Sequence, residues 1–365
     1  MDNLPNAKTE PPHGLTVQIP KSKNIVNLSI INTTSSITVP TYPFVTPAIE
    51  GHDVWTVPSY SFLIRNEAQK RTVLFDLGVR KDHENLAPAL AEKLKSQNFR
   101  IKVEKGVREI LDDHGVDTSG EYIEAIIWSH GHFDHTGDPS TFDQGTSLVV
   151  GPEFKERMMP GYPTNPDSPV LDSDWAGREV RQIQFTSQLQ IGRFKAFDYF
   201  NDGSFYLLDA PGHAVGHMCG LGRVTNEPQT FVFLGGDAAH DGGEFRPSQW
   251  MPFPPELPSF GNKSLTFCPG ELCAKLVPGA DDTTPMYRPA SNGAHLNVTR
   301  TEETIGKMQE VDALQQVLVV LAHDSSLLDV IDFFPKTAAR FGDHGWKDKA
   351  RWAFLKEFEP ELRAN

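Results

Sequence analysis

The chain has 365 residues, 34 of them Lys or Arg and 48 of them Asp or Glu, so its formal net charge at pH 7 is −14. This length allows one large domain with insertions. A surface that is acidic on average repels phosphate backbones and anionic membranes, so we expect neither nucleic acid nor a membrane as a partner.

Residues 1–25 are polar and contain several prolines. We expect them to form a flexible N-terminal tail, followed by a single domain over residues 26–365. The tail has no apolar stretch of the kind that a secretory signal requires, and no later run reaches membrane-spanning length. Three cysteines form no even disulfide framework, which is typical of a reducing compartment. The expected location is the cytoplasm, and the oligomeric state stays open.

β-branched and aromatic residues predict a first half rich in strands, and apolar residues at helical spacing predict two helices. The expected strands cover residues 25–39, 60–66 and 71–78, and the expected helices cover residues 84–97 and 106–115. An apolar run at residues 122–128 then predicts a buried strand. It leads directly into the segment WSHGHFDHTGD, which begins at Trp128.

Further strands and one helix are predicted beyond this segment. The expected strands are residues 147–151, 194–200, 204–213, 230–240 and 315–324, and the helix is residues 301–314. Three of these strands end near His213, Asp237 and His323, so a rigid scaffold would hold these side chains. Residues 241–300 are rich in Pro, Gly and aromatic side chains and are too long for an ordinary connection. We expect an insertion that forms a lid.

The segment after the buried strand places His130, His132, Asp134 and His135 at alternating spacing. Nitrogen and oxygen ligands together suit Zn²⁺, whereas Ca²⁺ and Mg²⁺ prefer oxygen ligands alone. One ion cannot readily use all four side chains, so the pattern predicts two divalent metal ions, with zinc as the expected metal. The additional ligands would come from the strand ends, which offer His213, Asp237 and His323.

This pattern resembles that of the metallo-β-lactamase-fold hydrolases. The HxHxDH motif of that family is matched by His130, His132, Asp134 and His135, and the family's PGH motif, bridging aspartate and last histidine are matched by His213, Asp237 and His323. The resemblance covers roughly residues 55–330. It implies an α/β fold of the αββα four-layer sandwich type, with the metals at one edge of two sheets and an extended insertion before the last metal-ligand strand.

By the same resemblance each residue acquires a role. His130, His132 and His213 would bind the first ion, Asp134, His135 and His323 the second, and Asp237 would bridge both. Asp76, in an early FDLG turn, would lie beneath the site, and His217 would be structural rather than a ligand.

Two ions about 3.5 to 4 Å apart can share a hydroxide and polarise a substrate oxygen, so the expected reaction is hydrolysis by attack of metal-bound hydroxide on a carbonyl. Asp134 is a candidate proton relay. An aspartate rather than a cysteine at position 237 resembles the lactonase and glyoxalase II branches. Lactonases of this fold carry a tyrosine three residues after the bridging aspartate, where this chain has His240. His240 is therefore a candidate catalytic residue, with a solvent-facing loop position as the alternative.

The predicted function is the opening of a cyclic ester or a related cyclic amide or carbamate. The alternatives are a thioester hydrolase of the glyoxalase II type and a non-catalytic, metal-stabilised binding protein. The expected partner is a small apolar or aromatic molecule, because the insertion is rich in rings, although these rings can instead pack the insertion down. They are Phe245, Trp250, Phe253, Phe260, Phe267 and Tyr287.

Overall fold

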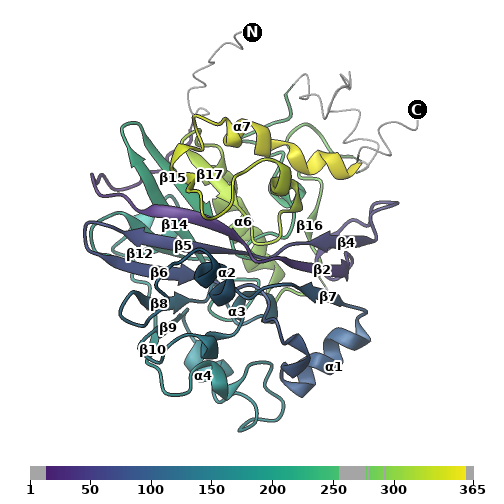
Figure 1. Cartoon of the computed structure of the whole chain (residues 1–365). Helices are drawn as coiled ribbons and strands as arrows, with labels where there is room; N and C mark the ends of the chain where they lie inside the picture. Colours follow the sequence, from purple (N-terminus) through teal and green to yellow (C-terminus); the bar gives the residue numbers. More distant parts are fainter. Residues whose placement is uncertain (1–13, 255–276, 278, 292, 359–365) are drawn as a thin grey trace.

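Two six-stranded β-sheets packed face to face form the centre of the molecule (Figure 1). The structure is a computed structural model that describes residues 14–254, 277, 279–291 and 293–358. Sheet 1 has the strand order β1-β5-β6-β8-β9-β10, in which β6, β8, β9 and β10 run parallel. Its strands are β1 (Asn27–Asn32), β5 (Tyr60–Asn66), β6 (Arg71–Phe75), β8 (Ile123–Ile127), β9 (Ser147–Val150) and β10 (Val180–Gln182).

Sheet 2 has the order β11-β12-β13-β14-β15-β17. Neighbouring strands are antiparallel except β15 and β17, which run parallel and are joined by the long connection that contains the predicted insertion. The strands are β11 (Gln190–Ile191), β12 (Phe194–Asp198), β13 (Phe205–Asp209), β14 (Met218–Asn226), β15 (Gln229–Leu234) and β17 (Val317–Val320).

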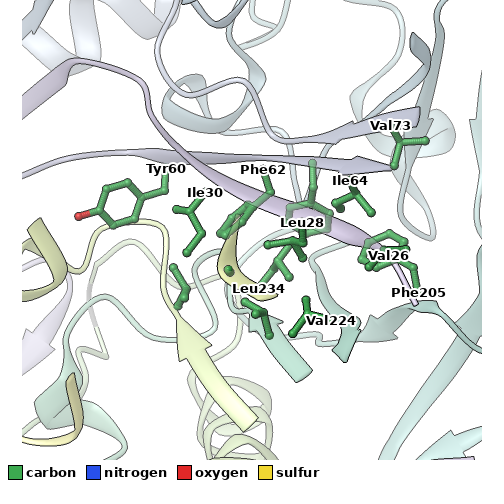
Figure 2. Packing of buried hydrophobic residues seen from close by; sticks show 14 of the residues in the cluster. Val26, Leu28, Ile30, Tyr60, Phe62, Ile64, Val73, Phe205, Val224 and Leu234 are labelled. Carbon is green, nitrogen blue, oxygen red and sulfur yellow. The ribbon is translucent and has the colours of Figure 1, made fainter. Parts of the chain in front are cut away.

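The main hydrophobic core fills the space between the two sheets (Figure 2). Alternate residues of a strand point to the same face, so Leu28 and Ile30 of β1 enter this core together. Phe205 and Leu234 meet them from sheet 2. Leu63 of β5 points the opposite way and is also buried, because helices cover the outer faces.

One helix layer covers the outer face of each sheet. Ile110 of α2 (Val107–Asp113) packs in one cluster with Leu63 and Leu74 of sheet 1. Met308 of α6 (Val298–Asp312) packs in another with Leu208 of sheet 2. The layer order is therefore helix, sheet, sheet, helix, which confirms the predicted αββα sandwich.

A smaller three-stranded sheet stands beside the sandwich and was not predicted as a separate unit. The backbone turns at Thr34, where φ is 58°, so the strand expected at residues 25–39 divides between β1 and this sheet. Its strands are β4 (Val54–Val57), β2 (Ser35–Pro40) and β7 (Arg100–Val103), and α1 (Pro88–Ser96) lies near them (Figure 1). The remaining regular elements include β3 (Val45–Thr46), β16 (Arg288–Pro289), α3 (Phe133–Thr136), α4 (Phe154–Met158) and α7 (Trp346–Arg351).

The described part of the predicted insertion is well packed. The rings of Phe253 and Trp352 lie 4.8 Å apart, and those of Tyr287 and Trp55 lie 5.9 Å apart. Phe245 is buried beside α6, and Trp250 is half-buried. The role of residues 241–300 as a lid remains a proposal. Two of its rings, Phe260 and Phe267, lie outside the described residues, as do Cys268 and Cys273.

The segment 14–25, expected to belong to a flexible tail, lies against sheet 2 in the structure. Val17 packs with the cluster under α6, and Ser22 Oγ donates a hydrogen bond to the Asp202 carbonyl oxygen at 2.7 Å. The buried Arg223 guanidinium donates to the Pro20 carbonyl oxygen at 2.6 Å. The alternating apolar residues Leu15, Val17 and Ile19 explain this packing. The polar and proline-containing composition of residues 1–25 instead favours a flexible tail. Among the described residues, none of the helices combines the length and apolar composition needed to cross a membrane.

Candidate metal centre

Strands from both sheets end at one edge of the sandwich, and the predicted ligands follow these ends. Residues 130–135 come after β8, His213 after β13, Asp237 after β15 and His323 after β17. Asp76 follows β6 in the same way. Because strand interiors fix their own ends, the loops start from a rigid frame. The structure brings all seven predicted ligands together.

The first group of donors gathers around one oxygen of Asp237. Oδ2 of Asp237 lies 3.3 Å from His213 Nε2 and 3.7 Å from His130 Nε2. His132 Nδ1 lies 3.0 Å from His213 Nε2. One donor atom from each of these four residues falls within 4.8 Å of the others, which is close enough to hold one metal ion.

The second group gathers around the other oxygen. Oδ1 of Asp237 lies 3.0 Å from His135 Nε2 and 3.2 Å from His323 Nε2. Asp134 Oδ2 lies 3.4 Å from His323 Nε2. One donor atom from each of Asp134, His135 and His323 likewise lies within 4.8 Å of the others. Asp237 therefore stands between two donor groups and offers one oxygen to each.

The residues fit a bound cation because several buried nitrogen and oxygen atoms that could bind a metal lack a well-aligned hydrogen bond. His130 Nε2, His135 Nε2 and Asp237 Oδ1 are buried in the centre without a well-aligned hydrogen bond, and His135 Nε2 and Asp237 Oδ1 form an ion pair with each other at 3.0 Å. Buried polar atoms are usually paired, and an unpaired one is costly. Divalent cations in the two donor groups would satisfy His130 Nε2 from the first group and His135 Nε2 and Asp237 Oδ1 from the second, and their nitrogen and oxygen chemistry matches transition-metal preferences.

The electrostatics favour neutral imidazoles in the first group, which is the protonation state that binds metals. Burial lowers the pKa of His132 to about 4 and holds the pKa values of His130 and His213 well below the ordinary range. His135 behaves differently. Burial opposes its charge, but the carboxylates of Asp237 and Asp76 raise its pKa well above the usual value. A cation in the second group would take the place of that proton.

Hydrogen bonds on the outer nitrogens orient the ligand rings. His135 Nδ1 donates to Asp76 Oδ2 at 2.9 Å, and Asp76 Oδ1 accepts from the Ser129 amide at 2.6 Å. His323 Nδ1 donates to the Pro58 carbonyl oxygen at 2.7 Å. His130 Nδ1 lies 3.0 Å from Ser129 Oγ. In each ring Nε2 is left to face the centre, and Asp76 occupies the position beneath the site that the sequence indicated.

His217 is buried beside the centre, but its ring nitrogens are committed to the backbone. Its Nδ1 donates to the Ala210 carbonyl oxygen at 2.9 Å, and its Nε2 accepts from the Asp237 amide at 3.0 Å. Burial lowers its pKa to about 4. The ring therefore holds the backbone of Asp237 in place, in keeping with the structural role expected for it.

His240 lies inside the site and does not face solvent. It is 4% exposed, and its Nε2 lies 3.4 Å from Asp237 Oδ2. On the other side, Glu244 Oε2 lies 3.7 Å from His240 Nδ1 and accepts hydrogen bonds from the amides of His240 and Asp241. Burial opposes the charged form of His240, yet the two carboxylates raise its pKa to about 10. His240 lies in the loop after β15 but is not solvent-facing as the alternative required, and its catalytic role stays a prediction.

Two residues near the ligands were missed by sequence reasoning. Glu244 is buried and follows His240 at a spacing of four in HDGGE, which is the available signal. His295 carries no motif. It lies within the predicted insertion, and its Nδ1 is 3.5 Å from His213 Nδ1.

Two cavities open onto the donor groups. They have volumes of about 560 and 330 Å³ and share His132, His213 and Lys93 among their lining residues. A small recess beside Asp134 and His240 continues the second cavity. In the described part of the chain, two larger cavities of about 710 and 700 Å³ contain none of the seven predicted ligands. The apolar walls near the ligands come from Phe44, Leu90, Leu94, Phe99, Phe133, Trp55 and Val57.

Comparison with known proteins decides the family. No family model matches the chain. The chain is 43% identical over 353 residues to gamma-lactamase FDB1 of Fusarium pseudograminearum (strain CS3096), which covers 94% of this chain and 85% of that protein. It is 42% identical over 370 residues to metallo-hydrolase mfmC of Annulohypoxylon moriforme, at 99% and 94% coverage. The chain belongs to the metallo-β-lactamase superfamily.

This metallo-β-lactamase superfamily member is a metal-dependent hydrolase. Its fold is similar to that of a point mutant of B. thuringiensis AiiA, solved with N-decanoyl-L-homoserine bound at the active site. The TM-score is 0.58 at 17% identity, over 86% of this chain and 99% of that chain. At that identity the likeness shows a common fold and carries no statement about substrate.

Proposed function

We propose that this hydrolase binds two divalent cations, with zinc as the expected metal, and opens a cyclic amide or cyclic ester by hydrolysis. The observation that carries the proposal is Asp237, which offers Oδ1 to one donor group and Oδ2 to the other. The similarity to a gamma-lactamase supports a cyclic amide as the substrate. Cyclic carbamates belong to the same chemistry, since the reacting carbonyl is again flanked by a ring heteroatom.

When bound, the cations would supply an activated water near neutral pH and polarise the reacting carbonyl. The chain's own residues would then manage protons. The Asp134 side chain lines both the 330 Å³ cavity and the recess and lies 3.4 Å from His323 Nε2, so it is placed to hold a proton close to the attacked carbon. Its backbone carbonyl accepts a hydrogen bond from Ser59 Oγ, which fixes the loop.

His240 would serve the leaving group. An amide nitrogen must be protonated as it leaves, because an amide anion is a very poor leaving group. His240 Nε2 faces the centre, and the Glu244 carboxylate lies behind the ring. The sequence position of His240, three residues after Asp237, is the one at which the resemblance to lactonases implies a tyrosine. Phe44, whose ring lies 4.9 Å from that of His240, and Phe99 line the recess beside His240 and would exclude water from it.

Metal analysis and a substrate panel test the proposal. Protein purified without chelator should contain about two equivalents of metal per chain. Chelator should abolish hydrolysis and added Zn²⁺ should restore it. In a panel of γ-lactams, γ-lactones, cyclic carbamates and linear thioesters, we expect the cyclic amides and esters to give the highest kcat/KM. Preference for the thioesters would support the glyoxalase II-like alternative. Tight metal binding without turnover of any compound would support the binding protein.

A further inference from the structure

We propose that His295 is a positioning residue for the first donor group: it accepts a hydrogen bond from Nδ1–H of His213 and so keeps the Nε2 lone pair of His213 directed at the centre. The inference rests on the proposed function, in which His213 binds a cation. It assigns a role to a histidine that the motif pattern leaves without one.

The hydrogen bonds of His295 determine which of its nitrogens can accept. Its Nε2 lies 2.9 Å from the carbonyl oxygen of Phe44, which can only accept, so the proton of the neutral ring sits on Nε2. Nδ1 of His295 is then an acceptor. It lies 3.5 Å from Nδ1 of His213, and the two rings are nearly perpendicular at 80°. The proton of His213 is therefore placed on its own Nδ1.

The remaining lone pair of His213 belongs to Nε2. That nitrogen lies 3.0 Å from His132 Nδ1 and 3.3 Å from Asp237 Oδ2, in the middle of the first donor group. The tautomer that His295 selects is the one that His213 needs in order to bind a cation through Nε2.

The other three predicted ligand histidines that face the centre through Nε2, namely His130, His135 and His323, show the same arrangement. Oxygen atoms of Asp76, Pro58 and Ser129 contact their Nδ1 atoms. Within the described part of the chain, His213 Nδ1 has no oxygen partner, and the hydrogen bond to His295 stands in its place. With His295 included, each predicted ligand histidine that faces the centre through Nε2 has a contact at its Nδ1 atom.

Backbone hydrogen bonds on both sides hold His295 in position. The Ala294 amide donates to the Pro43 carbonyl oxygen at 2.7 Å, and the Leu296 amide donates to the His213 carbonyl oxygen at 2.8 Å. The Asn297 amide donates to the Gly212 carbonyl oxygen at 2.8 Å. Residues 294–297 therefore connect the loop before β3 to the loop that carries His213. This placement explains why a residue from the insertion reaches the ligands.

A third bound cation is the competing explanation for the short distance between His213 and His295, because these two residues and His240 also lie close enough together to hold one. Such an ion would have to displace either the proton between His213 and His295 or the hydrogen bond from His295 to Phe44. The observed contacts use both nitrogens of His295, which favours the positioning role.

The test compares His295→Phe, His295→Asn, His213→Ala and Leu296→Ala. Phe keeps a ring but removes the acceptor, whereas the Asn oxygen can replace Nδ1. Leu296 is the neighbouring, 55% exposed side chain and serves as the matched control. Zn²⁺ affinity is measured by chelator competition, together with kcat, KM and Tm. We expect His295→Phe to weaken one of two equivalents roughly 10- to 100-fold, His295→Asn to recover most of the loss, and Leu296→Ala to bind like wild type.

His213→Ala distinguishes failure of the positioning role of His295 from failure of the proposed metal centre. If it loses one equivalent while His295→Phe binds both as tightly as wild type, the positioning role is wrong and the metal centre stands. If His213→Ala keeps both equivalents, the proposed metal centre itself is wrong. Long-range ¹H–¹⁵N spectra of the metal-free protein give a second measurement: a proton on Nε2 of His213, or three bound equivalents in the wild type, would overturn the role of His295.

Discussion

Asp237 faces His135 with one carboxylate oxygen and His213 with the other, at 3.0 Å and 3.3 Å. Removing this residue should therefore affect both donor groups together. We expect Asp237→Ala to reduce metal content from about two equivalents to less than one, and turnover by at least about 100-fold. Elemental analysis and steady-state kinetics provide the measurement, with the surface variant Asp332→Ala as control. Full retention of one equivalent would show that Asp237 serves a single group.

Asp76 should influence the second donor group without touching a cation. Its carboxylate accepts from His135 Nδ1 at 2.9 Å and from the Ser129 amide at 2.6 Å. We expect Asp76→Ala to weaken one metal equivalent roughly 10- to 100-fold because the His135 ring loses its orientation. Chelator competition measures the effect. Equal loss of both equivalents would indicate general unfolding of the edge instead.

His240 and Glu244 should act on turnover and leave metal content unchanged. We expect His240→Ala to lower kcat by roughly 10- to 1000-fold on a cyclic amide. Glu244→Gln keeps an oxygen for the two backbone amides but loses the charge behind the ring, so its kcat should lie between those of wild type and His240→Ala. If kcat stays at the wild-type value in both variants, neither residue takes part in the reaction.

Asp312 anchors a buried ion cluster that ties the start of the insertion to α6 and α7. It lies 2.7 Å from both Arg246 and Lys347, and all three side chains are almost fully buried. Asp312→Ala leaves two buried cations without their partner, which should lower the free energy of unfolding by about 3 to 5 kcal/mol. Urea unfolding measures this change. The exposed pair Asp332–Lys336 is the control, and Asp332→Ala should cost under about 1 kcal/mol.

Asp174 should make stability depend on pH. Burial raises its pKa from 3.8 to about 7, so between these values the folded chain holds a proton that the unfolded chain releases. Stability from this group is therefore greatest at low pH and falls as pH rises toward 7. Asn keeps an oxygen for the Leu171 amide but cannot titrate. Relative to wild type, Asp174→Asn should gain roughly 2 kcal/mol between pH 5 and pH 8. Parallel stability curves would contradict the burial argument.

Local signals in the sequence predict many of the strands and the ligands at residues 130–135, whereas the αββα sandwich follows from the resemblance to the metallo-β-lactamase-fold hydrolases. Buried strands show as apolar runs, and His130 to His135 crowd ligand chemistry into a few residues directly after one of them. The strand β14 escapes prediction since Gly220 and Gly222 lower its β propensity. The structure supplies the reason for Gly222: a Cβ at that position would lie 2.9 Å from Leu28 of the facing sheet.

Contacts between distant segments account for the other omissions. His295 acquires its role only when the chain places it beside His213, and no spacing rule connects the two residues. The packing of residues 14–25 has the same origin, because it depends on sheet 2 being present. Sequence patterns indicate which residues can bind a metal, whereas tertiary contacts decide which other side chains hold those ligands in position.

The order of the ligands along the chain has a consequence for synthesis on the ribosome. The first donor group is complete once Asp237 has been made, whereas the second also needs His323, which follows the insertion and α6. A nascent chain can therefore gather the donors for one cation well before it can gather those for the second. In the proposed two-metal centre, newly made protein would therefore complete its two donor groups in a fixed order.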